Sequence, residues 1–592
     1  MPRASRRTPI EAVAGCDLGT QSTKAAIVAL DGRPLGHASV AVDIVRPRAG
    51  WAEQDPRILE ESAYEAIRQA VAAAPVDTRI IALAFSGQMG GAIGLDVSGQ
   101  TVTPYESWMD TRADGDRAEI LAAHAPAILA ANGIIPFVGP RVRRWRREDA
   151  ALASRLARVV APAGFVAARF IGASQAEATC DRTQANLFGC LDARRGVWDV
   201  ALAEATGLPP ALLPRLVDPT DVIGRLSPEA AARCGLPSGL PVAGGIGDGT
   251  AGWLAAGGIT PGACVDSGGT SLSFAMTIDG FTADLETGLT CMPSAIAGQS
   301  YLIGFTTGTG MTHRWLTELL AGGDYDCLEA SGLRLPVGSA GVLAVGHLHG
   351  RVTPFEPDVR GLFLGFDEST TPGHFYRSLL EALAVEIGEW VAGARRLVPA
   401  LQIRSAASVS GGARSLLWLQ IKADLLGVPF ARMRPFVDAT RGAALVAAAA
   451  AGAARLDEPA WHASEAIVDL TVQPNPVHRP AYDHLAGTYR GLKPLLAPVC
   501  CLFVVGYFAY HAVEGEYGLF ALGKLQDRVA SLQKELDAIR AERKAMESHV
   551  ALMRPESLDR DMIDERAREA LNMADAKDIV IFLAPEDRRP AP

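Results

Sequence analysis

Short apolar runs separated by glycine-rich turns dominate the first part of the chain. Residues 12–37 are typical of a β-hairpin, because two apolar runs flank the turn Asp17-Leu18-Gly19-Thr20-Gln21-Ser22. A similar pattern returns at 263–280, where the turn is Ser267-Gly268-Gly269-Thr270-Ser271. We interpret this repeat as a sign that the chain contains two related halves.

The segments between and after these hairpins alternate between two kinds of pattern. Residues 80–85 form a short apolar, β-rich run, whereas 376–397 have the alanine-rich pattern of a helix. A third glycine-rich turn, Ser410-Gly411-Gly412-Ala413-Arg414-Ser415, follows a predicted strand and precedes a predicted helix at 416–426. This alternation predicts an α/β fold built in layers.

The pattern changes abruptly after residue 492. Residues 494–513 carry no charge, and a hydrocarbon core ~30 Å thick needs about 20 such residues. This run predicts a transmembrane helix, with a buried helix of the preceding domain as the alternative. Arg490 and Lys493 precede the run and Glu514 and Glu516 follow it, so the bias of basic residues predicts a cytoplasmic N-terminal side.

A second periodic segment follows at 519–553. Its apolar residues recur in steps of three and four, which is the spacing of a coiled-coil seam. The seam consists of Leu522, Leu525, Val529, Leu532, Leu536, Ile539, Met546, Val550 and Met553, interrupted by Arg543. Pro555 ends this helix, and 554–592 predict a short amphipathic helix at 559–571, an edge strand at 578–583 and a tail.

Composition and charge narrow the class of protein. The 592 residues are 49% apolar and 21% charged, which is enough apolar material for several buried cores. The net charge of -10, without long Lys/Arg runs, argues against nucleic acid as a partner. The nine Cys form no CxxC pair, so neither a zinc ribbon nor a disulfide framework is predicted. Val13-Ala14-Gly15-Cys16 resembles a lipoprotein cleavage site, but the apolar stretch that a signal peptide needs does not precede it.

The glycine-rich turns suggest phosphate binding. Glycine lets backbone N–H groups approach an oxyanion, and Ser or Thr hydroxyls donate further hydrogen bonds. One such turn is more often an ordinary hairpin, but two matching copies and a third turn favour the phosphate interpretation. No GxxxxGK[ST] motif occurs, which excludes a Walker-type loop as the nucleotide site.

Asp248 is the strongest candidate for a catalytic carboxylate. It follows a predicted strand at 240–243 and three glycines, so it can lie at the floor of a cleft and act as a general base. The alternative is the N-cap of a helix that begins near Thr250. His347 and His349 lack a neighbouring carboxylate cluster with ligand spacing, so we expect them to be loop residues and not metal ligands.

Several motifs occur together between 12 and 492. They are Asp17-Leu-Gly-Thr, Gly50-Trp51-Ala-Glu53-Gln54-Asp55-Pro56, Ser86-Gly87-Gln88-Met89, Trp108-Met-Asp110-Thr-Arg112, Gly244-Gly-Ile-Gly247-Asp248, Gly268-Gly-Thr-Ser271, Arg360-Gly361 and Gly411-Gly-Ala-Arg-Ser415. In this order they resemble the FGGY carbohydrate kinases, and within them the xylulokinase-like branch. The resemblance implies an α/β fold of two actin-like (ribonuclease-H-like) domains, at 1–245 and 246–492, that close on a sugar and ATP.

The resemblance also implies roles for individual residues. Asp248 would be the general base, and Asp17 would face Mg²⁺ through water or the attacking hydroxyl, unless it only stabilises its own turn. The phosphate-binding residues would be Gly19, Thr20, Gln21, Ser22, Gly268, Gly269 and Thr270. The adenosine would lie against Gly411, Gly412 and Ala413. The sugar would contact Gln88, Met89, Trp108, Asp110 and Asp248.

One departure from the family pattern concerns the sugar site. The xylulokinase pattern Gln-Met-His-Gly is replaced by Gln88-Met89-Gly90-Gly91. Loss of a buried, paired imidazole removes a contact worth ~1 to 3 kcal/mol, so the resemblance does not by itself assign D-xylulose. A ketose such as xylulose, another ketose and a polyol remain open as the substrate. Trp108 has a structural alternative, because an isolated Trp is more often a core residue than a sugar platform.

The tail at 495–583 has a second resemblance. An apolar run, Gly515-Glu-Tyr-Gly518-Leu, the heptads, Arg554-Pro555 and Asp564-Glu-Arg-Ala-Arg568 follow one another. They resemble the septum formation initiator (DivIC-type) proteins, which have one membrane span and a coil outside the membrane. The resemblance implies an inner-membrane anchor at 494–513, an exported C-terminus, and a coiled-coil partner in a division complex.

Two classes of function therefore remain open. The first is an ATP-dependent sugar kinase in the cytoplasm, and the second is a membrane scaffold that recruits division proteins. The kinase interpretation covers most of the chain and leads, and the whole chain resembles a fusion of the two.

Overall fold

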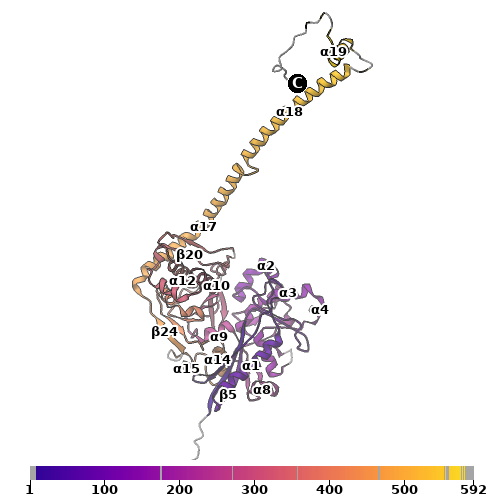
Figure 1. Ribbon diagram of the computed structural model, residues 1–592. Coiled ribbons are helices and arrows are strands. Elements are labelled where there is room, and N and C mark those ends of the chain that lie inside the picture. The colour runs from indigo at the N-terminus through magenta and orange to yellow at the C-terminus, as the bar shows by residue number, and fades with distance from the viewer. Residues whose placement is uncertain are drawn as a thin grey trace, which may run out of the picture. The chain divides into compact units, whose positions relative to one another are not determined.

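The computed structural model describes residues 9–579, apart from 174–176, 270, 284, 357, 464–466, 553, 555–558, 575–576 and 578, and it leaves the side chains of 492–503 undescribed. The chain divides into two compact units, Met1–Thr488 and Tyr489–Pro592. Within the described residues, the first unit contains all the strands and the second contains only helices as regular structure (Figure 1).

The first half of the larger unit is built on a mixed sheet. Its strands, in spatial order, are β13 (Val222–Arg225), β14 (Pro241–Ala243), β5 (Thr78–Gly87), β1 (Ile10–Leu18), β2 (Ser22–Ala29) and β3 (Pro34–Ala41). A further short strand, β15 (Ile246–Gly247), also pairs with β5. The predicted hairpin at 12–37 is therefore confirmed.

The second half contains a sheet of the same kind. Its strands, in spatial order, are β18 (Thr290–Pro293), β19 (Gln299–Thr306), β17 (Leu272–Asp279), β16 (Ala263–Gly268), β22 (Ser405–Val409), β23 (Phe430–Met433) and β24 (Val468–Val472). In both sheets the first strand pairs antiparallel with the next strand and parallel with a later one, β5 for β1 and β22 for β16. This shared pairing confirms the two related halves and the actin-like α/β fold.

Helices surround both sheets. Those of the first half are α1 (Pro56–Ala73), α2 (Asp114–Asn132), α3 (Val138–Glu148), α4 (Ala150–Arg155), α5 (Pro162–Ile171), α6 (Arg182–Ala185), α7 (Val200–Ala205), α8 (Pro228–Cys234) and α9 (Asp248–Ala255). Those of the second half are α10 (Thr309–Ala321), α11 (Tyr325–Leu333), α12 (Pro372–Leu397), α13 (Leu416–Leu426), α14 (Ala439–Ala450) and α15 (Pro459–His462).

Short two-stranded sheets pair β4 (Glu53–Gln54) with β7 (Tyr105–Glu106), β6 (Ile93–Leu95) with β8 (Arg158–Val160), β9 (Thr179–Asp181) with β12 (Arg215–Val217), β10 (Leu191–Asp192) with β11 (Val197–Trp198), and β20 (Leu343–Val345) with β21 (Leu362–Leu364).

Helix α1 shows how the sequence specifies these layers. Asp55 caps the helix by accepting a hydrogen bond from the Arg57 N–H, and Pro56 fits the first turn because it needs no donor there. Leu59, Ala63, Ala66, Ile67 and Ala70 recur every three or four residues and are fully buried in the core of the first sheet.

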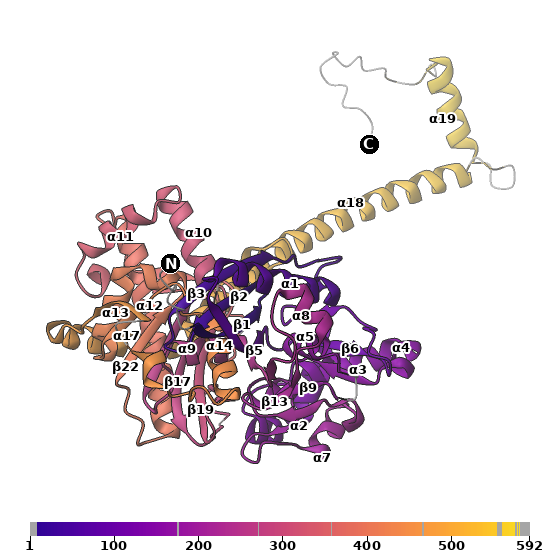
Figure 2. The same cartoon turned by 90° about the horizontal axis from the view of Figure 1, so that it is seen from below.

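Helices α9 and α14 lie together where the two halves meet (Figures 1 and 2). A methyl group on Gly442 of α14 would lie 2.1 Å from the Ala251 carbonyl oxygen of α9. A methyl group on Gly15 of β1 would lie 2.1 Å from the Thr440 carbonyl oxygen. Only glycine permits these close approaches, so α14, which is late in the sequence, packs directly on the first sheet.

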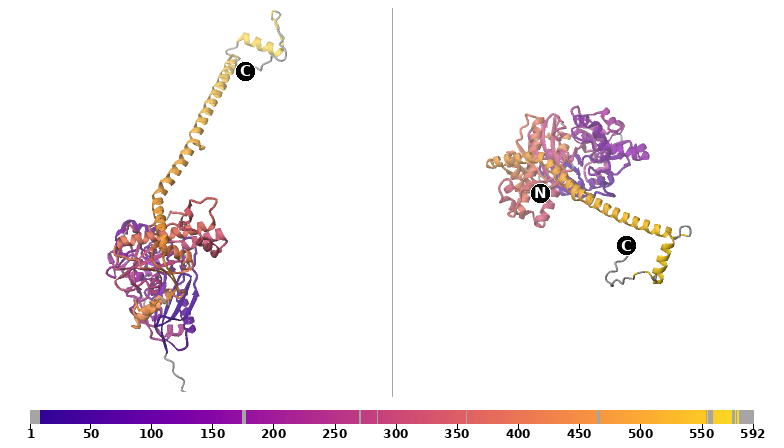
Figure 3. Two further views of the ribbon diagram at one scale, coloured as in Figure 1. Left: turned by 90° about the vertical axis from the view of Figure 1, so that its left-hand side faces the viewer. Right: turned by 90° about the horizontal axis from the view of Figure 1, so that it is seen from above.

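All the regular secondary structure that is described in the smaller unit is helical. Helix α17 (Arg479–Glu514) ends in this unit and is followed by α18 (Leu519–Leu552) and α19 (Arg560–Leu571). Figure 3 shows α18 as one uninterrupted helix, as the heptad pattern predicted. Helix α19, capped by Asp559, confirms the predicted short helix. The predicted edge strand at 578–583 lies outside the described residues.

The predicted transmembrane helix is not supported. Among the residues that the structure describes, no helix is long and apolar enough to cross a membrane. The part of the 494–513 run with described side chains begins only at residue 504 of α17, and a span needs about 20 residues. The side chains of 494–503 lie outside the described residues.

Candidate active site

Asp17 lies at the end of β1, one residue before the strand gives way to the first glycine turn. Its carboxylate is 8% exposed and accepts a hydrogen bond of 2.9 Å from the Ser86 hydroxyl on the neighbouring strand β5. Burial raises the pKa of Asp17 to about 7, with further contributions from the charges of Asp248 and Asp438, while Ser86 opposes the rise. Because its side chain bonds across strands, the alternative of a local Asx turn is wrong.

Asp248 is the first residue of α9, and Gly247 is the N-cap. Asp248 is therefore not the N-cap itself, and its carboxylate accepts a hydrogen bond of 2.7 Å from the Gly249 N–H. Burial raises the pKa of the Asp248 carboxyl to about 6, although this hydrogen bond lowers it. A methyl group on Gly247 would lie 2.5 Å from the Met89 sulfur, so Met89 packs against the residue that directly precedes Asp248.

Asp438 is a third carboxylate of the site and was missed from the sequence. It caps α14 by accepting hydrogen bonds from the Thr440 N–H and hydroxyl, at 3.0 and 2.5 Å. Its charge contributes to the raised pKa of Asp17. The packing of α14 on β1 places it there, and no local motif marks it.

The glycines of the second and third turns serve two different purposes. A methyl group on Gly268 would lie 2.9 Å from the Trp418 ring, and one on Gly412 would lie 2.4 Å from that ring and 2.8 Å from the Gly268 carbonyl oxygen. These two glycines are required for close packing of the turns. Gly411 has nothing within 4 Å of such a methyl group, and Gly269 has only Ser410, at 3.8 Å. Close packing therefore does not require glycine at Gly269 or Gly411, whose backbone is left uncovered by the described residues. Thr270 lies outside the described residues.

The first turn joins the sugar candidates to the phosphate candidates. The Gly19 N–H donates to the Ser22 carbonyl across the turn, at 3.1 Å, with Gln21 between them. The Thr20 hydroxyl donates to the Gln88 side-chain oxygen at 3.3 Å and accepts from the Trp108 indole at 3.4 Å. Trp108 is 39% exposed, so the alternative that it is a core residue is wrong.

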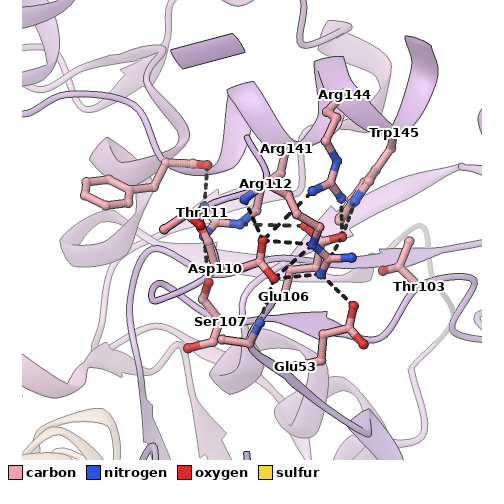
Figure 4. A network of polar contacts seen from close by, with 12 residues as sticks. Glu53, Thr103, Glu106, Ser107, Asp110, Thr111, Arg112, Arg141, Arg144 and Trp145 are labelled. Atoms are coloured by element: carbon pink, nitrogen blue, oxygen red, sulfur yellow. Dashed lines mark hydrogen bonds and ion pairs between the residues drawn. The ribbon is translucent and has the colours of Figure 1, made fainter. Parts of the chain in front are cut away.

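Asp110 lies in a buried charged network (Figure 4). Its carboxylate accepts the Ala52 N–H at 2.8 Å and pairs with Arg112 at 2.7 Å, and Arg112 also pairs with Glu53. Burial works to raise the pKa of Asp110, but the hydrogen bonds from Arg112 and Ala52 lower it overall. In this arrangement the Asp110 carboxylate faces Arg112.

Arg141 of α3 belongs to the same network and was also missed. Its guanidinium is fully buried and donates to the Ser107 carbonyl at 2.6 Å (Figure 4). It also donates to the Gly90 carbonyl at 2.9 Å. It thereby ties the loop that follows Gln88 and Met89 to the loop that carries Trp108. The two loops that carry the sugar candidates are held in one relative position.

His347 and His349 lie in the segment between β20 and β21, outside any helix or strand, so they are loop residues as predicted. His347 approaches the Glu386 carboxylate at 3.2 Å, and Gly308 packs against the ring of His349. Within the described residues, no group of three or more His, Cys, Asp or Glu side chains is placed to hold a metal ion.

Comparison with known proteins identifies the class of molecule that has this fold and site. Residues 12–255 match the N-terminal domain of the FGGY family of carbohydrate kinases, and residues 267–451 match its C-terminal domain. Residues 504–585 match the DivIC septum formation initiator family. The chain belongs to the FGGY family of carbohydrate kinases, and it carries a septum formation initiator domain C-terminal to the kinase in the sequence.

Individual relatives place the kinase part more narrowly. The chain is 26% identical over 502 residues to a xylulose kinase of Escherichia coli, covering 82% of this chain and 99% of the relative. It is 24% identical over 498 residues to a gluconokinase of Bacillus subtilis, covering 81% and 94%. The crystal structure of xylulose kinase from Rhodospirillum rubrum has 28% identity and a TM-score of 0.75, covering 82% of this chain and 99% of that one. The chain is therefore a xylulokinase-like sugar kinase.

Proposed function

We propose that this kinase transfers the γ-phosphate of ATP to a hydroxyl of a ketose such as xylulose, or of a polyol, with Asp248 as the general base. The observation that carries the proposal is the position of Asp248. Asp248 begins α9, follows the glycine against which Met89 packs, and has a carboxyl pKa raised to about 6 by burial. A base of that strength is mostly ionised at neutral pH and still accepts a proton readily.

The residues divide the reaction between them. Gln88 and Trp108, joined through Thr20, orient the sugar so that one hydroxyl faces Asp248. As that hydroxyl oxygen bonds to the γ-phosphorus, its proton passes to Asp248, the bond from the γ-phosphorus to the β,γ-bridging oxygen breaks, and ADP leaves. The open backbone at Gly269 and Gly411 receives the nucleotide, with its phosphates at Gly269 and its adenosine beside Gly411.

A divalent cation fits beside Asp17. Mg²⁺ is usually held by one or two carboxylates together with phosphate oxygens and water, so a cage of three protein ligands is not needed. Asp17 is the residue we propose to face it, with Asp438 adding negative charge. The ion would neutralise charge on the phosphates during transfer.

A panel of sugars tests the proposal. Relatives of this chain include xylulose kinases and a gluconokinase, and the glycine at position 90 replaces a polar side chain of the xylulokinase pattern. We expect ATP-dependent phosphorylation of a ketose or polyol in a coupled ADP-release assay over pentuloses, hexuloses, polyols and sugar acids. ADP release with none of these acceptors would contradict the proposal.

We expect enzyme activity to fall as the pH is lowered, while the contribution of the same carboxyl groups to the free energy of unfolding increases. Asp17 and Asp248, with pKa values of about 7 and 6, become neutral as pH falls, so kcat/KM should drop through this range. An unfolded Asp titrates near ~3.9, so between these values the folded state binds more protons and the contribution of these groups to stability increases as pH falls. Steady-state rates and thermal melts of the protein without ligands, measured from pH 5 to 8, check both directions. A kcat/KM that stays flat down to pH 5 would rule out this base.

We propose a second function for the tail, in which α18 pairs with a helix of a division protein. The match to the septum formation initiator family and the exposed seam of α18 favour it. The eight apolar seam residues from Leu522 to Val550 are 41 to 62% exposed. Arg543 occupies the seam, and in a parallel pair of two copies it would face itself, so it opposes self-pairing and favours a partner with an acidic residue opposite.

Replacing Arg543 by an apolar residue should therefore allow two copies of the chain to associate through α18. We expect Arg543→Leu to convert the chain to a dimer at micromolar concentration in sedimentation equilibrium, because the seam becomes continuous. Lys544→Leu adds the same side chain one position off the seam and is the matched control. Dimer formation by both variants, or by neither, would contradict the role of Arg543.

A further inference from the structure

The two halves of the kinase place an aspartate at the same position. Asp17 is paired in register with Ser86 of the parallel strand β5, and Asp266 of β16 is paired in register with Ser408 of β22. In each case the serine hydroxyl donates to the aspartate. Each aspartate also precedes a glycine turn, so Asp266 is the counterpart of Asp17 in the nucleotide half.

The surroundings of the two aspartates differ in one respect. Asp266 forms a buried ion pair with Lys422, and both side chains are 1% exposed. Near Asp17, by contrast, the carboxylates of Asp248 and Asp438 add negative charge and raise its pKa. The structure thus keeps one aspartate of the pair in a negative field and neutralises the other.

Lys422 lies directly behind the packed turns. It is one helical turn after Trp418 on α13, and its ammonium group is 4.1 Å from the centre of the Trp418 ring. The same ring also packs against the backbone at Gly268 and Gly412. Burial lowers the pKa of Lys422, and the charge of Asp266 opposes this.

We propose that Lys422 is a positioning residue of the nucleotide site, which neutralises Asp266 so that the phosphate chain of ATP can approach the open backbone at Gly269. This inference rests on the proposed function, because it takes Gly269 as part of the phosphate site. A bare carboxylate three residues before Gly269, screened little by water, would repel a polyphosphate. The same ion pair holds Trp418 beneath the two packed glycines.

Three variants separate charge compensation from direct contact and from simple support. Lys422→Met leaves Asp266 uncompensated, Asp266→Asn leaves Lys422 free to lose its proton, and the double variant replaces one neutral pair by another. The full-length chain is used throughout. Calorimetric binding of a non-hydrolysable ATP analogue is measured beside the KM for ATP and for the sugar, and melting curves report folding.

We expect Lys422→Met to weaken nucleotide affinity by ~10-fold or more, as like-charge juxtaposition does, with the sugar KM within about twofold. The double variant should recover most of this loss, and Asp266→Asn should bind nucleotide more tightly than Lys422→Met. If Lys422→Met does not fold, the other two variants decide the matter, because both should fold and bind nucleotide.

Other outcomes would overturn the proposal. A double variant that folds but binds nucleotide as poorly as Lys422→Met would mean that Lys422 contacts the ligand itself. Equal losses in sugar and ATP affinity would mean a structural role only. A different result separates this proposal from the proposed function. If the wild-type chain phosphorylates no sugar, but the variants rank as expected in their affinity for the analogue, the proposed function fails and the role of Lys422 stands.

Discussion

Asp248→Asn is expected to reduce sugar phosphorylation by ~10² to 10⁴-fold, because the acceptor hydroxyl then keeps its proton during attack. Nucleotide affinity should stay within a few-fold, since Asp248 follows Gly247, which packs against Met89 in the half that holds the sugar candidates. Single-turnover kinetics with saturating sugar, together with calorimetric nucleotide binding, measure the two quantities separately.

The control for this variant is the same substitution at a capping aspartate outside the site. Asp199 caps α7 by accepting the Leu202 N–H at 2.9 Å, and asparagine caps helices equally well. Asp199→Asn should retain wild-type turnover. Retention of a tenth or more of that turnover by Asp248→Asn would remove Asp248 from the role of general base.

Gly269→Val is expected to raise the KM for ATP by ~10-fold to 10²-fold, because a branched side chain displaces the phosphate from the backbone N–H groups. The protein should still fold, since a methyl group at this position meets only Ser410, at 3.8 Å. Gly269 does not have the positive φ that requires glycine, so the expected loss comes from blocked approach alone. The KM for sugar should remain unchanged.

Gly412→Val provides the contrasting variant. A side chain there would overlap the Trp418 ring and the Gly268 carbonyl, so this protein should be destabilised and lose affinity for both substrates. Melting curves of the two variants, run beside their kinetics, distinguish a blocked ligand from a damaged fold. A Gly269→Val variant with the wild-type KM for ATP and turnover would show that the phosphates lie elsewhere.

The fold was predictable because its signals are local. The two hairpins, the glycine turns and the helix at 376–397 are each marked by residues within a few positions of one another. Asp17 and Asp248 could be identified as candidates for the same reason, since Asp17 begins a short motif and Asp248 ends one. The heptads of α18 likewise identify a helix without reference to any other part of the chain.

The missed residues depend on contacts between distant segments. Asp438 reaches the site only because glycines at 15 and 442 let α14 pack on β1 and α9. Arg141 lies in an arginine-rich helix whose sequence is typical of a solvent-exposed surface, yet its guanidinium is buried, with the carboxylates of Glu106 and Asp110 nearby and the Gly90 carbonyl as an acceptor. Lys422 has no local signal of its role, because its partner Asp266 lies far away in sequence.

The most direct test of the central claim follows the phosphate itself. The full-length chain is incubated with ATP labelled in its γ-phosphate and with the best acceptor from the sugar panel, beside Asp248→Asn. The account predicts that the label moves to a hydroxyl of the sugar in amounts equal to the ADP formed, and that Asp248→Asn gives less than a hundredth of this product. Label released as free phosphate at the same rate with and without sugar would contradict the assignment of this chain as a sugar kinase.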